Sequence, residues 1–162
     1  MTCIVPQSRY YKGDALFKFG QGLSLTTFNV SCNPAAIDDS SMAATPPGPP
    51  LPIYRRVIVS CDVTNTGKMV GDEVLMIFHA VGDDIRAAAS KLHPVPLKQL
   101  VEFERISDLG PGASATTTFS LNPDVSLALV TANGSKAVYP GEHQLIFSTG
   151  AAAQDIVQTV TI

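Results

Sequence analysis

The chain has 162 residues, of which 45% are hydrophobic and 15% are charged, and its formal net charge is −3. This length is typical of one domain with one hydrophobic core, and the apolar fraction excludes a disordered polar tail. The weakly acidic balance gives no basic surface for nucleic acid, and no apolar run reaches the roughly 18 residues that a membrane helix needs.

The N-terminal part leads from an irregular segment into a β-favouring one. Residues 1–16 show no hydrophobic periodicity and are predicted to form a linker. Residues 17–28 begin with two phenylalanines and pass through Gly20, and a second glycine two positions later, into an apolar, threonine-containing run. Glycine can adopt a positive φ or let another backbone approach closely, and the run itself favours a strand. We therefore predict that residues 23–28 begin the first strand and that this strand ends at Cys32.

Residues 33–54 read as an insertion between the first two strands. They contain aspartates and serines followed by a proline-rich run. Proline cannot donate a hydrogen bond to a sheet and favours an extended polyproline conformation. We interpret the insertion as a long solvated loop, and a docking site for a proline-binding partner is the alternative.

The rest of the chain consists of short β-favouring runs separated by turn residues. The clearest is the run of residues 57–64, in which apolar and polar side chains alternate, and the Asn133-Gly134 pair is a strong hairpin signal. Only residues 85–91 favour a helix. The predicted strands cover residues 57–64, 73–79, 97–106, 113–121, 125–130, 136–139, 142–148 and 155–162. Seven to eight strands of this kind predict an all-β, antiparallel sandwich of immunoglobulin or fibronectin type III-like architecture.

The apolar positions of these runs give a predicted core. Truncation of Phe103 or Phe119 to alanine is predicted to cost about 3 to 5 kcal/mol. The core is predicted to contain Phe19, Leu23, Phe28, Val59, Val63, Leu75, Ile77, Phe103, Phe119, Leu121 and Leu145.

The three cysteines, Cys3, Cys32 and Cys61, match no metal or redox spacing. Cys61 continues the apolar alternation of its run and is interpreted as a small core residue. We interpret all three as plain thiols, and a bridge between Cys32 and Cys61 is the less favoured alternative.

Two Asn-x-Ser sequences, at Asn29 and Asn133, are candidate N-glycosylation sites for a eukaryotic secretory route. Asn133 lies in a predicted turn, where an acceptor is accessible. Asn29 lies near the end of a predicted strand and is the weaker candidate.

A series of motifs in one order along the chain carries a family resemblance. The motifs are residues 10–13, 17–28, 63–67, 71–74, 98–105, 109–112 and 139–142. Together they resemble the C-terminal fibronectin type III-like domain of glycoside hydrolase family 3, over nearly the whole chain from Tyr10 to Ile162. The opening segment is most similar to the plant-type β-xylosidase branch of that family, which also includes arabinofuranosidases.

The sequence departs from the family pattern at several positions. Lys18 stands where proline is usual, Gln21 where an aromatic residue or histidine is usual, Leu25 where tyrosine is usual and Glu102 where glycine is usual. The proline-rich insertion is also not part of the pattern. The chain is therefore identified as a divergent member.

The resemblance implies an accessory role. In that family the nucleophilic aspartate lies in an N-terminal barrel and the acid/base residue lies in or near the following α/β domain, so no catalytic residue is carried over. Residues 1–16 would be the tail of a connection from that catalytic portion, and residues 17–162 would be the fibronectin type III-like domain. The implied partners are the barrel and α/β domains of the same parent chain, with candidate interdomain contacts at Tyr10, Tyr11, Phe17 and Phe19.

The resemblance also implies that the parent protein hydrolyses O-glycosyl bonds and is extracellular or secretory. Residues 1–6 nevertheless lack the charged start and apolar core of a signal peptide.

No independent catalytic, cofactor or metal site is predicted from the residues themselves. Glu102 and Glu104 share a strand face, but a flat face offers no pocket around two carboxyl groups, so we interpret them as part of a polar outer face opposite a buried Phe103. The histidines show no metal-binding spacing. The alternative function is an autonomous carbohydrate-binding or structural and adhesion module, with polysaccharide as partner and candidate glycan contacts at Tyr54 and Tyr139.

Overall fold

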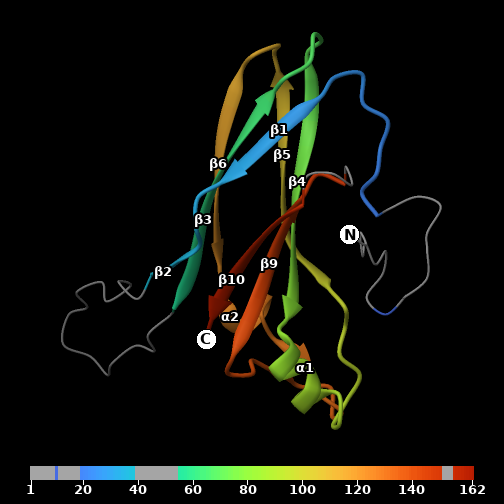
Figure 1. Ribbon diagram of the computed structural model, residues 1–162, viewed down its shortest axis with the longest axis vertical. Coiled ribbons are helices and arrows are strands. Elements are labelled where there is room, and N and C mark those ends of the chain that lie inside the picture. Colours follow the sequence, from blue (N-terminus) through green and yellow to red (C-terminus); the bar gives the residue numbers. More distant parts are fainter. Residues whose placement is uncertain (1–9, 11–18, 39–54, 151–154) are drawn as a thin grey trace.

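The computed structural model describes residues 10, 19–38, 55–150 and 155–162. Within these residues the chain forms ten strands and two short helices (Figure 1). The strands are β1 (Phe28–Cys32), β2 (Ala36–Asp38), β3 (Arg56–Asn65), β4 (Gly71–Val81), β5 (Gln99–Leu109), β6 (Ser114–Leu121), β7 (Leu129–Val130), β8 (Lys136–Ala137), β9 (Glu142–Ser148) and β10 (Ile156–Thr161). The helices are α1 (Asp83–Ala89) and α2 (Pro123–Ser126). None of the described helices is long and apolar enough to cross a membrane.

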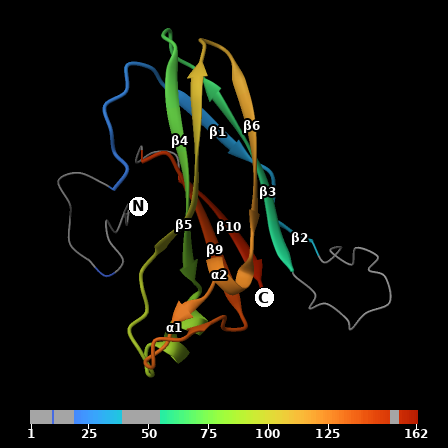
Figure 2. The same ribbon diagram turned by 180° about the vertical axis from the view of Figure 1, so that it is seen from behind.

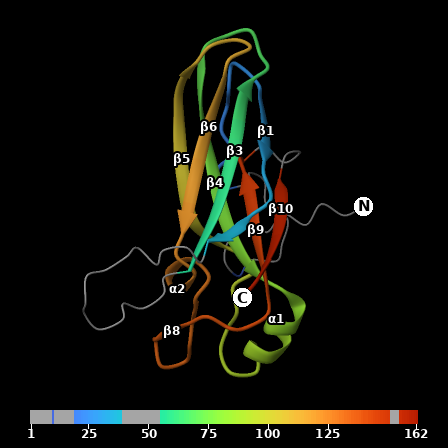
Figure 3. The ribbon, with the colours of Figure 1, turned by 90° about the vertical axis from the view of Figure 1, so that its left-hand side faces the viewer.

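Two antiparallel four-stranded sheets pack face to face, as Figures 1 and 2 show from opposite sides. In the first sheet β3 pairs with β1 and β2 along one edge and with β6 along the other. The second sheet has the order β10-β9-β4-β5. A small third sheet, the β7–β8 hairpin, lies with α1 and α2 toward one end of the sandwich (Figure 3). The predicted all-β sandwich is therefore confirmed. The described residues form ten strands rather than the predicted seven to eight, and one of them, β2, lies within the predicted insertion.

The alternation predicted for β3 is confirmed and explains the first sheet. Val57, Val59, Cys61 and Val63 are each at most 1% exposed, while the intervening side chains are less buried. A strand with one face on the core and one toward solvent produces this period of two.

The core between the sheets confirms most of the predicted core residues and corrects three of them. Phe28, Val59, Val63, Leu75, Ile77, Phe119, Leu121 and Leu145 are all buried. Phe19 and Phe103, by contrast, are 57% and 58% exposed, and Leu23 is fully exposed. The three exposed residues lie outside the space between the sheets, because Phe19 and Leu23 precede β1 and Phe103 faces outward from the second sheet.

Some predicted element boundaries are also wrong. The first strand begins at Phe28 rather than at residue 23. Within the predicted strand of residues 125–130, the first two residues belong to α2, because the side-chain oxygen of Asn122 accepts a hydrogen bond from the amide of Asp124 at 3.0 Å and caps this helical turn. Within the predicted insertion, β2 pairs with β3, and residues 39–54 lie outside the described residues.

A disulfide joins Cys32 and Cys61, so the interpretation of both as thiols is wrong. The pairing of β1 with β3 places these two residues directly opposite each other. The neighbouring amide of Asn33 donates to the carbonyl of Ser60 at 2.9 Å, which makes Cys32 and Cys61 a non-hydrogen-bonded pair, in which side chains are closest. The bridge therefore follows from strand register, which sequence spacing alone does not give.

Reduction of this bridge is expected to lower the free energy of unfolding by about 3 kcal/mol, because it releases a loop with a sequence separation of 29 residues in the unfolded chain. Urea unfolding with and without a reducing agent measures the difference. A chain in which both cysteines are replaced by alanine serves as the control and should be insensitive to the reducing agent. Equal stability of the oxidised and reduced wild type would contradict the expectation.

Candidate functional site

The segment before β1, residues 19–27, lies over the edge of the second sheet, and we name it the junction segment (Figure 1). Its C-terminal end is held by Asn65, whose side chain is fully buried. The Asn65 Oδ1 accepts a hydrogen bond from the Thr26 hydroxyl at 2.7 Å, and its Nδ2 donates to the carbonyls of Met69 and Leu109 at 2.8 and 2.7 Å. The amide of Gly67 donates to the same Oδ1 at 3.0 Å. One buried carboxamide thus ties the junction segment to the ends of β3 and β5 and to the turn before β4.

The N-terminal end of the junction segment is held by close backbone packing at Gly20. Gly20 has a φ of +80°, and a Cβ atom there would collide with the side chain of Met76. On the other side Gly150, also at φ +80°, faces the Gly20 carbonyl with no room for a side chain. The prediction that the two glycines of this segment adopt a positive φ or allow close approach is therefore confirmed for Gly20. It is wrong for Gly22, where a Cβ atom would meet nothing within 4 Å and φ is not positive.

A groove of about 580 Å³ lies between the junction segment and the start of β4. Phe19, Leu23 and Ser24 line one wall, and Asp72 and Glu73 line the other. The groove is open to solvent, and its lining combines apolar side chains with two carboxyl groups.

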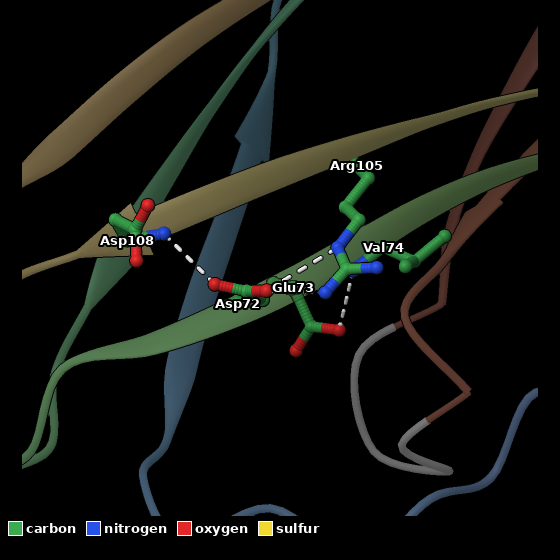
Figure 4. Close-up of polar contacts among 5 residues, drawn as sticks. All are labelled: Asp72, Glu73, Val74, Arg105 and Asp108. Carbon is green, nitrogen blue, oxygen red and sulfur yellow. Dashed lines mark hydrogen bonds and ion pairs between the residues drawn. The ribbon is translucent and has the colours of Figure 1, made fainter.

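The carboxyl groups of the groove have opposite electrostatic environments (Figure 4). Asp72 forms an ion pair with Arg105 at 2.5 Å and accepts a hydrogen bond from the amide of Asp108 at 2.8 Å. These two contacts lower the pKa of Asp72. Burial raises the pKa of Glu73, although the amide of Val74 donates to its carboxylate at 2.8 Å. Asp72 is thus held as an anion that fixes the register shift between β4 and β5, where Asp108 has a φ of +55°.

The outward side of the second sheet carries a group of apolar side chains among polar ones, and we name this group the outer face. It consists of Met76, Phe78, Leu100, Phe103, Ile146 and Val157, which cross-strand pairing places side by side on β4, β5, β9 and β10. Phe19 packs edge-on against Phe78, with ring centroids 6.2 Å apart, and covers part of this face. Phe103 and Val157 remain 58% and 56% exposed. The outward side of a sheet in a sandwich is usually polar, and a contiguous apolar surface marks an interaction site.

The predicted interdomain contacts fall partly within this region. Phe19 bridges the junction segment and the outer face, and Tyr10 is 56% exposed. Tyr11 and Phe17 lie outside the described residues. The exposed Leu100, Phe103 and Val157 were not predicted as contacts, and the two leucines of the junction segment, Leu23 and Leu25, are also exposed.

The predicted glycan contact Tyr139 is half-buried and its hydroxyl is hydrogen-bonded to His93 Nε2 at 2.9 Å. Tyr54 lies outside the described residues. The candidate N-glycosylation sites Asn29 and Asn133 are both exposed, the first on β1 and the second in the turn between β7 and β8. Glu102 and Glu104 are exposed on β5. The described residues contain no group of three or more histidine, cysteine, aspartate or glutamate side chains that could hold a metal ion.

Two buried histidines form a row of hydrogen bonds, which we call the histidine chain. His79 and His143 are 1% and 0% exposed, and His79 Nε2 lies 2.9 Å from His143 Nδ1. His79 Nδ1 lies 3.1 Å from Gln99 Nε2, which also donates to the carbonyl of Ala128. His143 Nε2 lies 2.8 Å from the carbonyl of Tyr139. The chain links β4, β5 and β9 to the loops at the α1 end of the sandwich.

The direction of every hydrogen bond in this chain follows from its two ends. The amide nitrogen of Gln99 can only donate, so His79 Nδ1 accepts and His79 Nε2 carries the proton. That proton is donated to His143 Nδ1, and His143 Nε2–H donates to the Tyr139 carbonyl. The ring of His79 is therefore neutral, and burial together with the neighbouring His143 lowers the pKa of His79 to about 3.

The family model of the fibronectin type III-like domain matches residues 85–150 of this chain. Among curated proteins, 143 residues of this chain are 32% identical to a protein named probable exo-1,4-β-xylosidase from Aspergillus terreus, which covers 84% of this chain and 17% of that protein. A β-xylosidase from Formosa agariphila is 34% identical over 156 residues, which covers 96% of this chain and 19% of that protein. This chain therefore spans less than a fifth of the length of these relatives.

Among solved structures, a β-glucosidase from Kluyveromyces marxianus superimposes with a TM-score of 0.73 at 24% identity, over 95% of this chain and 16% of that one. A β-glucosidase from Listeria innocua, crystallised with laminaribiose, gives a TM-score of 0.67 at 20% identity, over 90% of this chain and 17% of that one. At these identities the likeness establishes the fold.

Proposed function

This chain carries the fibronectin type III-like domain of family 3 glycoside hydrolases, and we propose that it is a non-catalytic accessory domain of such an enzyme. In this proposal the parent protein hydrolyses O-glycosyl bonds in β-xylosides or β-glucosides. The domain packs on the catalytic domains of the same chain and stabilises them. Its small share of the length of the related β-xylosidases supports a role as one part of a larger protein.

The outer face is the observation that carries the proposal. Phe103, Leu100 and Val157 are between 41% and 58% exposed, although the sheet that bears them has a complete core on its other side. Burial of one such side chain in an interface contributes about 1.5 to 3 kcal/mol. A domain that packs on a neighbour through this face gains that stabilisation, whereas a solitary sandwich gains nothing from it.

The junction segment supports the same arrangement, because it is rigidly attached to the domain at both ends. Asn65 and Gly20 hold it, and the exposed Leu23 and Leu25 lie between these two points. Leu23 lines the groove together with Phe19 and with Met76 of the outer face, so it extends the apolar surface there. A preformed surface of this kind loses little conformational entropy when it docks.

The carboxyl groups at the groove favour a structural role over catalysis. Asp72 is neutralised by Arg105, and its low pKa excludes it as a proton donor near neutral pH. Glu73 has a raised pKa. The neighbouring carboxylate, that of Asp72, is already held by hydrogen bonds to β5. Hydrolysis of a glycosidic bond needs two carboxyl groups that are both free to act on the substrate.

The test uses the complete natural protein that contains this domain, as wild type and with Phe103→Ser. We expect the variant to keep its initial rate on an aryl β-xyloside or β-glucoside, and to lose that activity about tenfold faster at elevated temperature. A tenfold change corresponds to about 1.4 kcal/mol of lost interdomain contact. The half-life of activity at a fixed temperature is the measurement.

The matched control is Val130→Ser, because Val130 is similarly exposed, at 49%, but lies on the β7–β8 hairpin away from the outer face. Its half-life should equal that of the wild type. Equal half-lives for Phe103→Ser and wild type would contradict the proposed docking face. A natural gene that encodes no barrel or α/β domain beside this one would contradict the accessory role itself.

A further inference from the structure

The two Asn-x-Ser sequences occupy opposite structural settings, and we propose that Asn133 is the N-glycan acceptor of this chain while Asn29 is left unmodified. The ligand class is a lipid-linked oligosaccharide, the donor in N-glycosylation. This inference concerns maturation of the chain and does not depend on the proposed accessory role.

The Asn133 sequence lies at the exposed tip of the β7–β8 hairpin. The amide of Thr131 donates to the Ser135 carbonyl at 2.9 Å, and the amide of Gly134 donates to the Thr131 carbonyl at 3.0 Å. Gly134 has a φ of +84°, which closes the turn. The whole acceptor sequence is therefore folded into a compact loop that projects from the domain.

Within this loop the acceptor carboxamide and the serine hydroxyl are already in contact. Asn133 Oδ1 accepts hydrogen bonds from the Ser135 hydroxyl at 2.7 Å and from the Ser135 amide at 3.1 Å. It also accepts one from the Thr131 hydroxyl at 2.6 Å. Since a backbone amide can only donate, the atom it contacts must be the carboxamide oxygen. Among the described residues none accepts a hydrogen bond from Asn133 Nδ2, which is the atom that receives the sugar.

The Asn29 sequence is held in an extended strand instead. Asn29 pairs with Thr64 of β3, and Ser31 pairs with Asp62. Side chains two residues apart in a strand are separated by about 6.6 Å along the chain, so the hydroxyl and the carboxamide do not meet. The Cys32–Cys61 disulfide follows Ser31 directly and locks this conformation.

The disulfide also indicates the type of compartment in which the modification occurs. Structural disulfides form in oxidising compartments such as the lumen of the endoplasmic reticulum, where N-glycosylation takes place. In the transfer step, Asn133 Nδ2 forms a bond to the anomeric carbon of the oligosaccharide, and the bond from that carbon to the lipid pyrophosphate breaks. Nδ2 loses one proton, the lipid pyrophosphate leaves, and nothing is oxidised or reduced.

The proposed glycan site leaves the outer face free. The β7–β8 hairpin lies beside α1 and α2 at one end of the sandwich, whereas the junction segment runs toward the opposite end before β1 (Figures 1 and 3). A glycan on Asn133 would therefore project from the α1 end, and would not cover Phe103 or the junction segment.

The experiment is secretion of the chain from a eukaryotic host behind a secretory leader, followed by intact-mass analysis before and after treatment with an endoglycosidase. We expect one glycan per chain on the wild type and on Asn29→Gln, and none on Asn133→Gln or Ser135→Ala. Ser135→Thr keeps the hydroxyl and should keep the glycan. Chains collected from the lumen of the host are analysed alongside, so that a variant that is not exported is still measured.

A Cys61→Ser variant tests whether the disulfide is what keeps Asn29 unmodified. Loss of the bridge should raise glycan occupancy at Asn29 and leave occupancy at Asn133 unchanged. Wild-type chains that are unmodified at Asn133, or whose Asn133 is only deamidated, would overturn the proposal. A glycan on Asn29 of the disulfide-bonded wild type would overturn its second half.

Discussion

Replacement of Phe119 by alanine is expected to lower the free energy of unfolding by about 3 to 5 kcal/mol. Phe119 is 4% exposed on β6, pairs with Val59 of β3 and belongs to the core between the two sheets. Truncation of its ring would remove buried contacts and leave a cavity that the paired strands cannot close. Chemical denaturation of the isolated domain, followed by circular dichroism, measures the loss.

Phe103→Ala is the matched control, because it removes the same atoms from a ring that is 58% exposed on the outer face. Its expected cost is less than about 1 kcal/mol, as for most surface substitutions. The prediction made from sequence, that both substitutions cost about 3 to 5 kcal/mol, is thus corrected for Phe103. A loss below 1 kcal/mol for Phe119→Ala, or similar losses for both variants, would show that the faces of β5 and β6 are assigned wrongly.

The fold could be predicted where alternation is regular, and β3 is the clearest case. Its inward positions form one unbroken period of two, so Val59 and Val63 were correctly placed in the core. On β5 the same reasoning failed, because the pairing with β4 shifts register between Ile77 and Phe78. A bulge changes which face each later residue occupies. The apolar residues Leu100 and Phe103, an odd number of positions apart, are the sequence signal that one alternation does not fit.

The junction segment could not be predicted as a loop from local preference. Its apolar and threonine residues favour a strand, but Thr26 donates to the buried Asn65 and the Thr27 carbonyl accepts from the amides of Thr66 and Gly67 at 2.8 and 3.1 Å. These contacts come from residues about 40 positions away. Tertiary hydrogen bonds therefore override the local strand preference up to Phe28.

The candidate docking surface was predictable only in part for a similar reason. Phe19 was predicted as an interdomain contact from its motif, and that role stays a prediction. Val157 joins the same surface only through the pairing of β10 with β9 and of β9 with β4. The disulfide likewise needed the register that places Cys32 opposite Cys61. Contacts between strands distant in sequence require the topology, which the pattern of a single strand does not contain.

The histidine chain shows how a buried polar group can be stable without charge. An additional proton on His79 Nδ1 would face the donor Gln99. Protonation of His79 would replace a hydrogen bond by a contact between two donors in a buried site. The native fold therefore excludes this proton, and unfolding in acid admits it.

The free energy of unfolding is accordingly expected to fall by about 4 kcal/mol between pH 7.5 and pH 3 on account of His79. The pKa of His79 is about 3 in the folded chain, whereas the unfolded chain has the ordinary histidine value of 6.5. Between these values the unfolded chain binds a proton that the folded chain does not, so stability is complete above pH 6.5 and decreases as the pH falls. Urea unfolding at half-unit steps of pH gives the slope.

His79→Gln isolates this contribution, because glutamine keeps a donor for His143 Nδ1 and does not titrate. The two carboxyl groups with shifted pKa values, Asp72 and Glu73, affect the pH dependence equally in wild type and variant. The low pKa of Asp72 also reduces stability in acid, and the raised pKa of Glu73 increases it. The difference in slope between wild type and variant therefore belongs to His79. Parallel curves for the two proteins would show that His79 binds its proton as readily in the folded chain as in the unfolded one, and would contradict the neutral, buried chain of hydrogen bonds.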